Sequence, residues 1–278
     1  MTSGIGVPDG IHVTRWGSTG PTVLMIHGGP QGGPIGGAEA FKKQEALADR
    51  GWQLVLPDRP GHARTPSRGP EDMDVDAVWA AAMLGESSHL VGHSYGGLVA
   101  MAAATLRPGA VRSLTLIEAP VYAAAEDDPD VQASRAEQER IIGADIPPLQ
   151  RLMEFSAFAR IPREELGTPS MDQLTAMGEG LGRMRSPGEW DGRTAITAIR
   201  RAGIPVLAIT GGWSSRFDSM GRGLADLTGG RHTIVDSGHH FPQFVDPEFN
   251  DVLDAFLRSA EKGHAEPQDA PKVPAPSV

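Results

Sequence analysis

The sequence predicts an α/β fold: a mostly parallel central sheet with helices on both faces, interrupted by a helical insert. Two observations indicate the sheet. Short apolar runs recur along the chain, as in strands buried on both faces of a parallel sheet. Segments with helical spacing separate most of these runs, and this alternation predicts right-handed crossovers. The insert is indicated by a third observation, the absence of strand-like runs between residues 122 and 190.

Seven segments are predicted as strands. The first alternates polar and apolar residues, and most of the others are continuously apolar. In chain order they are residues 11–16, 22–26, 52–56, 89–91, 114–117, 205–209 and 232–235. Helices are expected over residues 38–49, 74–84 and 98–106, and from 247 to about 261. A glycine-rich loop, residues 27–37, follows the second strand.

These elements divide the chain into a core and an insert. We assign residues 1–121 and 191–262 to the α/β core, and residues 122–190 to a helical cap or lid. Within the insert, apolar residues recur at helical spacing between prolines and glycines. Residues 263–278 are rich in proline, alanine and charge, so we expect a disordered tail.

Composition narrows the class of protein. The chain has 278 residues, of which 40% are hydrophobic and 22% charged, as in globular proteins. A net charge of −10 with scattered basic residues argues against binding to nucleic acid or anionic membranes. No apolar run reaches the ~20 residues of a membrane span, and the first residues lack a secretion-signal pattern. Without cysteine there is no disulfide or thiolate site, and we expect a cytoplasmic protein. The oligomeric state is not indicated.

The strongest motif is Gly92-His93-Ser94-Tyr95-Gly96, which stands between a predicted strand and a predicted helix. A Gly-x-Ser-x-Gly pentapeptide in this setting is typical of a nucleophile elbow. The chain turns so sharply at the serine that the residues two positions away must lack a side chain. The turn holds the Ser94 hydroxyl at a helix N-terminus, where developing negative charge is favoured.

A serine becomes nucleophilic only when a base takes its proton, and the base needs an acid to hold its tautomer. The late segment Gly238-His239-His240-Phe241-Pro242 supplies the base. Together with His27-Gly28-Gly29-Pro30 after an early strand, these motifs closely resemble those of the α/β-hydrolase family. The resemblance covers residues 11–262 apart from the insert, which stands where that family carries its lid or cap.

The resemblance implies which histidine acts. The family pattern is Gly-His-Phe-Pro with a proline seven residues after the histidine. Counting back from Pro247 selects His240, whereas counting forward from Gly238 selects His239. We favour His240, because it keeps both the Phe-Pro neighbour and the spacing.

The acid departs from the family pattern. Ser214 stands where the family most often has an aspartate, in Thr210-Gly211-Gly212-Trp213-Ser214. Glu118 directly follows the strand 114–117, and some family members place their acid there. Asp218 could serve if its loop folds back. We favour Glu118, because a carboxylate after a buried strand at the C-terminal edge of the sheet is costly without a function.

The oxyanion of acyl transfer needs hydrogen-bond donors. We expect the backbone N–H groups of Tyr95 and Gly29, since Pro30 has none. Trp213 and Trp190 are candidate substrate contacts, and the insert carries apolar side chains that could line a pocket. These are Met153, Phe155, Phe158, Met171, Met177, Met184 and Trp190.

The remaining histidines are expected to be structural. His27 is expected to buttress its loop, and His93 to point into the core, while His62 lies in another loop. We predict no metal, because the side chains of His239 and His240 diverge and no third ligand is indicated. We also predict no cofactor, since the glycine-rich loop lacks the endings of a phosphate-binding loop.

These features predict a serine hydrolase that cleaves a carboxylic ester or lactone of a small, hydrophobic substrate through an acyl-enzyme. A serine nucleophile argues against dehalogenase and epoxide hydrolase chemistry, which need a carboxylate there. A carbon–carbon bond hydrolase remains an alternative. So does a ligand sensor or pseudoenzyme on the same fold, for which Ser214 is the best support.

Overall fold

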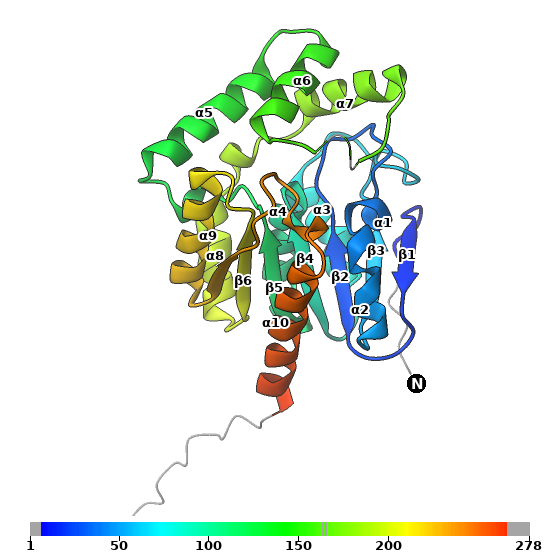
Figure 1. Cartoon of the computed structure of the whole chain (residues 1–278), viewed down its shortest axis with the longest axis vertical. Helices are drawn as coiled ribbons and strands as arrows, with labels where there is room; N and C mark the ends of the chain where they lie inside the picture. Colours follow the sequence, from blue (N-terminus) through cyan, green and yellow to red (C-terminus); the bar gives the residue numbers. More distant parts are fainter. Residues whose placement is uncertain (1–6, 163, 165, 266–278) are drawn as a thin grey trace, which may run out of the picture.

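A computed structural model describes residues 7–162, 164 and 166–265 of the chain (Figure 1). Its centre is a seven-stranded sheet with the order β1-β3-β2-β4-β5-β6-β7, in which β1 is antiparallel to β3 and the other neighbours are parallel. The strands are β1 (Val13–Trp16), β2 (Thr22–Ile26), β3 (Gln53–Pro57), β4 (Ser88–His93), β5 (Val111–Ile117), β6 (Val206–Thr210) and β7 (Arg231–Ile234). The predicted fold class is confirmed, and each predicted strand is present to within three residues at either end.

The described part of the chain contains ten α-helices. They are α1 (Gly37–Ala40), α2 (Ala46–Asp49), α3 (Met73–Ala82), α4 (Tyr95–Leu106), α5 (Pro129–Gly143), α6 (Pro148–Phe158), α7 (Met171–Arg183), α8 (Gly192–Arg201), α9 (Ser215–Thr228) and α10 (Glu248–Ala265). None of the helices described has the length and apolar composition of a bilayer span.

Two predicted boundaries are wrong. The helix expected over residues 38–49 is divided into α1, a 3-10 turn (Lys42–Glu45) and α2. Helix α10 continues to Ala265, so the first three residues of the predicted disordered tail are helical. The rest of that tail, residues 266–278, lies outside the described residues.

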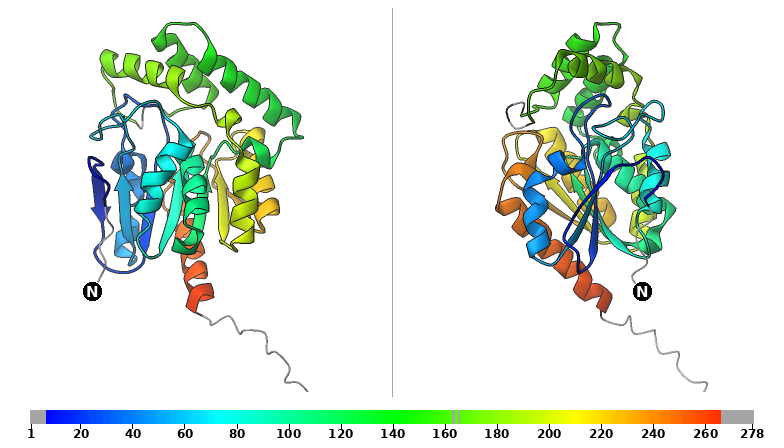
Figure 2. Two further views of the ribbon diagram at one scale, coloured as in Figure 1. Left: turned by 180° about the vertical axis from the view of Figure 1, so that it is seen from behind. Right: turned by 90° about the vertical axis from the view of Figure 1, so that its right-hand side faces the viewer.

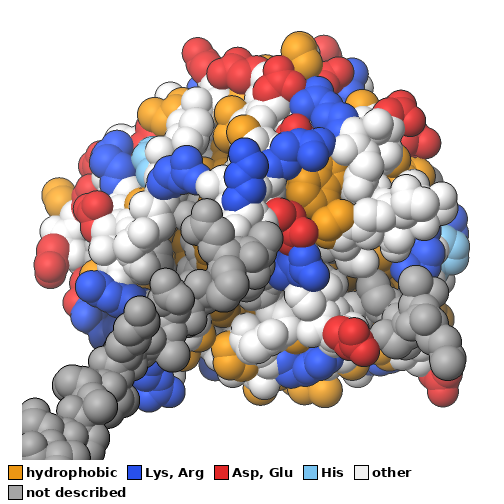
Figure 3. Space-filling view, turned by 90° about the horizontal axis from the view of Figure 1, so that it is seen from below, with side chains coloured by type: hydrophobic (Ala, Val, Ile, Leu, Met, Phe, Trp, Pro, Cys, Tyr) orange, Lys and Arg blue, Asp and Glu red, His pale blue; other side chains and the backbone are white. Residues whose placement is uncertain are grey.

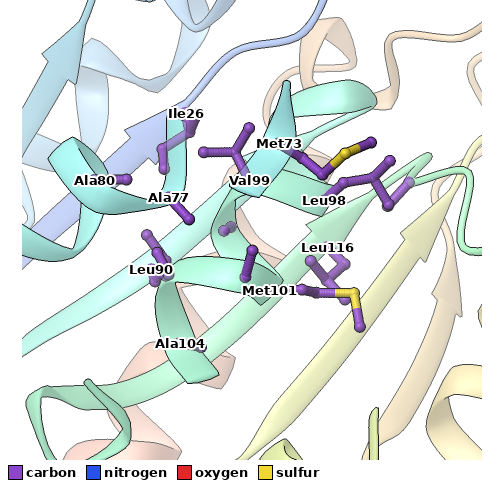
Figure 4. Close-up of a cluster of buried hydrophobic side chains, with 14 of the residues drawn as sticks. Ile26, Met73, Ala77, Ala80, Leu90, Leu98, Val99, Met101, Ala104 and Leu116 are labelled. Atoms are coloured by element: carbon purple, nitrogen blue, oxygen red, sulfur yellow. The ribbon is translucent and has the colours of Figure 1, made fainter. Parts of the chain in front are cut away.

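Alternate side chains of each central strand enter two separate cores, as the period of a strand requires. In β2, Leu24 and Ile26 belong to the core that also contains side chains of α3, α4 and α8, whereas Val23 and Met25 belong to the core with side chains of α2 and α10. Figure 2 shows the helices on the two faces of the sheet. Figure 4 shows the first core, where α4 carries a row of buried apolar side chains against β4 and β5. Both faces are therefore covered, which explains why the strands are continuously apolar.

Helices α5, α6 and α7 lie between β5 and β6 in the chain and beyond one end of the sheet in space (Figures 1 and 2). The described part of the insert 122–190 contains helices and turns but no strand. The opposite end of the molecule is seen in Figure 3, where basic and acidic side chains are interspersed. Helices α6 and α7 contribute to a cavity that they share with the loops after β2 and β4.

Candidate active site

Ser94 lies in the turn from β4 to α4 with φ 54° and ψ −126°. A positive φ is rare for a residue with a side chain, and it persists only where the surroundings enforce it. Two backbone hydrogen bonds do so: Ser94 N donates to Ile117 O at 2.8 Å, and Gly97 N donates to Ser94 O at 2.8 Å. The hydroxyl is consequently held out of the backbone at the start of α4.

The two glycines of the motif are required by close backbone contacts. A Cβ atom on Gly92 would lie 2.5 Å from the carbonyl oxygen of Gly96. A Cβ atom on Gly96 would lie 2.3 Å from the carbonyl oxygen of Ile26, at the end of β2. Both obstacles are backbone atoms, so no rotamer change relieves them.

We therefore expect Gly96→Ala to lower the free energy of unfolding by at least about 2 kcal/mol, because β2 or the elbow must shift to admit the methyl group. Gly109→Ala is the matched control, since a Cβ atom there meets nothing within 4 Å. Urea unfolding of both variants measures the difference. Equal stability of the two variants would show that the elbow relaxes without cost.

His240 lies between Ser94 and Glu118. Its Nε2 is 2.9 Å from Ser94 Oγ, and its Nδ1 is 3.1 Å from Glu118 Oε2. The side chain is buried, and His93 Nε2 donates to the backbone oxygen of His240 at 2.8 Å. His239, the alternative, instead accepts a hydrogen bond from Phe241 N at 3.1 Å through its Nδ1. The structure thus brings His240, and not His239, to the serine.

Glu118 follows β5 and is 1% exposed, with φ 47°. Its Oε1 accepts a hydrogen bond from Gly211 N at 2.6 Å, and its Oε2 accepts one from Trp213 Nε1 at 3.1 Å. Burial raises the pKa of the Glu118 carboxyl, and these two N–H donors oppose that rise. With His240 Nδ1, three nitrogens face two oxygens, which suits the ionised, acceptor-only form.

The proton positions follow from these contacts. Burial lowers the pKa of the His240 imidazole, which favours the neutral ring. We assign the one proton of the ring to Nδ1. The Glu118 carboxylate already accepts hydrogen bonds from two N–H groups, so it is also the acceptor towards Nδ1. Nε2 is then a free acceptor for the Ser94 hydroxyl. The arrangement can move a proton from the serine to the imidazole while the carboxylate balances the charge.

Asp218, the alternative acid, lies in the first turn of α9 and not in the loop that the sequence suggested. Its Oδ1 accepts a hydrogen bond from Thr210 Oγ1 at 2.5 Å, and that hydroxyl is also 2.8 Å from His232 Nε2. The carboxylate is thereby held at the edge of β6 and β7, and it makes no contact with His240.

The two tryptophans expected to contact substrate lie elsewhere. Trp213 donates to Glu118, as described above, and Trp190 Nε1 donates to Asp74 Oδ1 at 3.0 Å. None of the described residues that line the cavity beside Ser94 is a tryptophan. The indole of Trp213 therefore lies against Glu118, and the indole of Trp190 lies against Asp74 of α3.

The expected oxyanion donors flank Ser94. Tyr95 is the first residue of α4, where N–H groups lack an intrahelical acceptor. Gly29 has φ 87°, a conformation that glycine adopts without strain. His27 Nδ1 donates to Gly28 O at 2.8 Å and so fixes the peptide that carries the Gly29 N–H. His27 Nε2 in turn accepts from Arg59 N at 3.0 Å, which accounts for the expected buttress.

A buried ionic cluster beneath this loop was not foreseen. Arg59 is fully buried and pairs with Glu71 at 2.6 Å and Asp76 at 2.9 Å. Its guanidinium lies 4.9 Å from the centre of the Tyr95 ring, and Glu71 Oε2 accepts from Gln31 N at 3.3 Å. The cluster joins the glycine-rich loop to α3 and α4. Its one signal in the sequence was Arg59, directly after the predicted strand 52–56 and the residues Pro57 and Asp58.

A cavity of about 90 Å³ borders Ser94 and His240. Its walls are mainly apolar, and no Lys, Arg, Asp or Glu lines it among the described residues. Of the insert residues expected to line a pocket, Phe155, Met177 and Met184 do so, whereas Met153 and Met171 are 54% and 61% exposed. The described residues contain no group of three His, Asp or Glu that could hold a metal ion.

Comparison with curated proteins finds ester hydrolases. The chain is 26% identical to the pimeloyl-[acyl-carrier protein] methyl ester esterase of Aeromonas hydrophila over 265 residues, which cover 89% of this chain and 99% of that protein. It is 33% identical to the lipase LipV of Mycobacterium tuberculosis over 156 residues, which cover 50% of this chain and 58% of LipV.

Solved structures share the fold. N-acyl homoserine lactonase AidH, complexed with N-butanoyl homoserine, has a TM-score of 0.62 at 19% identity, covering 90% of this chain and 93% of that chain. A thermophilic esterase from Thermogutta terrifontis has a TM-score of 0.63 at 20% identity, covering 90% and 93%. The model of the alpha/beta hydrolase fold family matches residues 21–247. With its sheet order and its elbow, this chain belongs to the alpha/beta hydrolase fold family.

Proposed function

We propose that this protein is a serine hydrolase that cleaves a carboxylic ester or lactone through an acyl-enzyme. The observation that carries the proposal is the His240 ring between Ser94 Oγ at 2.9 Å and Glu118 Oε2 at 3.1 Å. The curated relatives named as methyl ester esterases support an ester over other acyl compounds.

In the acylation step, His240 Nε2 takes the proton of the Ser94 hydroxyl as Oγ attacks the carbonyl carbon. The carbonyl oxygen becomes an oxyanion, which the N–H groups of Tyr95 and Gly29 receive. When the tetrahedral intermediate collapses, His240 returns the proton to the leaving alkoxide. Glu118 keeps the proton of Nδ1 in place and stabilises the imidazolium.

Deacylation repeats the same proton transfers with water. His240 Nε2 takes a proton from a water molecule, whose oxygen attacks the acyl carbon. The second intermediate then releases the carboxylic acid, and the proton returns to Ser94 Oγ. No group beyond these side chains and backbone amides is needed.

The substrate is proposed to be small, apolar and uncharged near the reacting carbonyl. Among the described residues, no Lys, Arg, Asp or Glu lines the cavity beside Ser94. His62 and His93 also line it, and burial lowers the pKa of both rings. Both rings are therefore neutral at pH 7. Helices α6 and α7 close the cavity from above, and we propose that the segment 122–190 acts as the cap.

The sensor alternative depended on Ser214, which leaves the usual acid position without a carboxylate. Glu118 supplies a carboxylate to His240 from β5 instead. No other observation favours a sensor.

The test is hydrolysis of two p-nitrophenyl esters of similar size, the butyrate and the hemisuccinate. We expect kcat/KM to be at least about 100-fold higher for the butyrate, because the cavity offers no partner for a buried carboxylate. A fluorophosphonate probe should label Ser94, as mass spectrometry of the labelled peptide would show. Failure both to hydrolyse neutral esters and to be labelled would refute the proposed function.

A further inference from the structure

Gln138 is a polar side chain in an apolar cavity. It lies on α5, is 5% exposed, and lines the same cavity as Ser94. The proposed acyl transfer does not use it. A buried amide surrounded by apolar groups is costly unless its polar atoms are paired.

One end of the Gln138 amide is fixed. Tyr122 OH donates to Gln138 Oε1 at 2.7 Å. The Ser134 hydroxyl hydrogen-bonds the same phenol oxygen. Since the phenol has a single proton, which goes to Gln138, Ser134 is the donor in that second contact. Burial raises the pKa of Tyr122 to about 12, so the phenol keeps its proton at neutral pH. This chain of hydrogen bonds assigns Oε1 to the Tyr122 side and the NH2 group to the cavity side.

The other end of the amide is available. None of the described residues accepts a hydrogen bond from Gln138 Nε2, and this nitrogen is not one of the fully enclosed unpaired atoms, so it is accessible from the cavity that Gln138 lines. A substrate that fills the cavity would cover this donor, and covering it without an acceptor is costly, so the cavity favours a substrate with an acceptor at this point. The ligand atom must be a hydrogen-bond acceptor, because the NH2 group only donates.

We propose that Gln138 Nε2 binds an acceptor oxygen in the part of the substrate that does not react, so that the preferred substrate is an uncharged ester or lactone with a second oxygen function, such as an ether or ketone. This inference rests on the proposed ester hydrolysis. It makes Gln138 a specificity-determining residue, held in orientation by Tyr122.

Matched ester pairs test the inference. On the acyl side, p-nitrophenyl methoxyacetate is compared with the butyrate, and 3-methoxypropanoate with the pentanoate. On the alcohol side, 2-methoxyethyl acetate is compared with butyl acetate. Each pair exchanges one methylene for an oxygen. The ratio of kcat/KM within a pair is measured for the wild type and for Gln138→Met, so that intrinsic reactivity cancels between the two proteins.

In Gln138→Met we expect the kcat/KM ratio that favours the oxygen-bearing ester to fall about tenfold, which corresponds to one neutral hydrogen bond. The fall should appear in the pairs that vary the part of the ester bound in the cavity. Tyr122→Phe should lower the same preference by a smaller factor, since it frees the amide to turn. Gln132→Met, an exposed position on the same helix, should leave every ratio unchanged. Gln138→Leu serves if Gln138→Met does not fold.

If the ratios of wild type and Gln138→Met agree in all three pairs, the inference is wrong while the hydrolase stands. If folded wild-type protein hydrolyses none of these esters, the proposed function itself fails.

Discussion

Ser94→Ala should lower kcat/KM for neutral esters by at least about 10⁴-fold, because the attacking oxygen is removed while the oxyanion donors and the cavity remain. The substitution keeps the Cβ atom and therefore the elbow conformation at φ 54°. His240 loses one hydrogen-bond partner and stays neutral. We expect the free energy of unfolding to change by less than about 1 kcal/mol. Steady-state hydrolysis of p-nitrophenyl butyrate and urea unfolding measure the two effects.

Ser259→Ala is the matched control, since Ser259 is exposed on α10 and apart from the cavity. It should hydrolyse the butyrate at the wild-type rate. If folded Ser94→Ala retains more than about 1% of activity, Ser94 is not the nucleophile.

Glu118→Gln is expected to lower kcat by roughly 10³–10⁴-fold, as amide replacement of a triad acid does elsewhere. If the amide oxygen of the glutamine accepts from Gly211 N, its NH2 group faces His240 Nδ1 and Trp213 Nε1. The NH2 group can only donate, so Nδ1 must become the acceptor and the ring proton moves to Nε2. That tautomer cannot take a proton from Ser94. The measurement is kcat for p-nitrophenyl butyrate at constant pH.

Asp218→Asn separates this effect from the removal of any nearby carboxylate. Asp218 accepts from Thr210 and does not touch the imidazole, so the variant should keep kcat within about threefold of the wild type. The reverse result, an inactive Asp218→Asn and an active Glu118→Gln, would exchange the two roles. In Glu118→Gln the new NH2 group also faces the N–H donor of Trp213. The folded fraction of this variant should therefore be determined before rates are compared.

The sequence determined the sheet and the elbow. Continuous apolar runs predicted the strands because a strand buried on both faces has no polar position. The Gly-x-Ser-x-Gly motif could be interpreted from the sequence because Gly92 is required by the turn itself, where a Cβ would meet the carbonyl oxygen of Gly96. The order of motifs along the chain then identified the family, and the spacing to Pro247 favoured His240.

Only the tertiary structure brought particular side chains together. Whether Glu118 or Asp218 reaches His240 depends on the adjacency of β5 and β6 and on α9, which turns Asp218 towards Thr210. Trp213 was placed by the same packing, which sets its indole N–H on Glu118. Gln138 had no signal in the sequence, because it becomes special only where α5 packs beside the cavity. Local patterns reflect the conformation of neighbouring residues, whereas a binding site is made of contacts between segments that lie far apart in the chain.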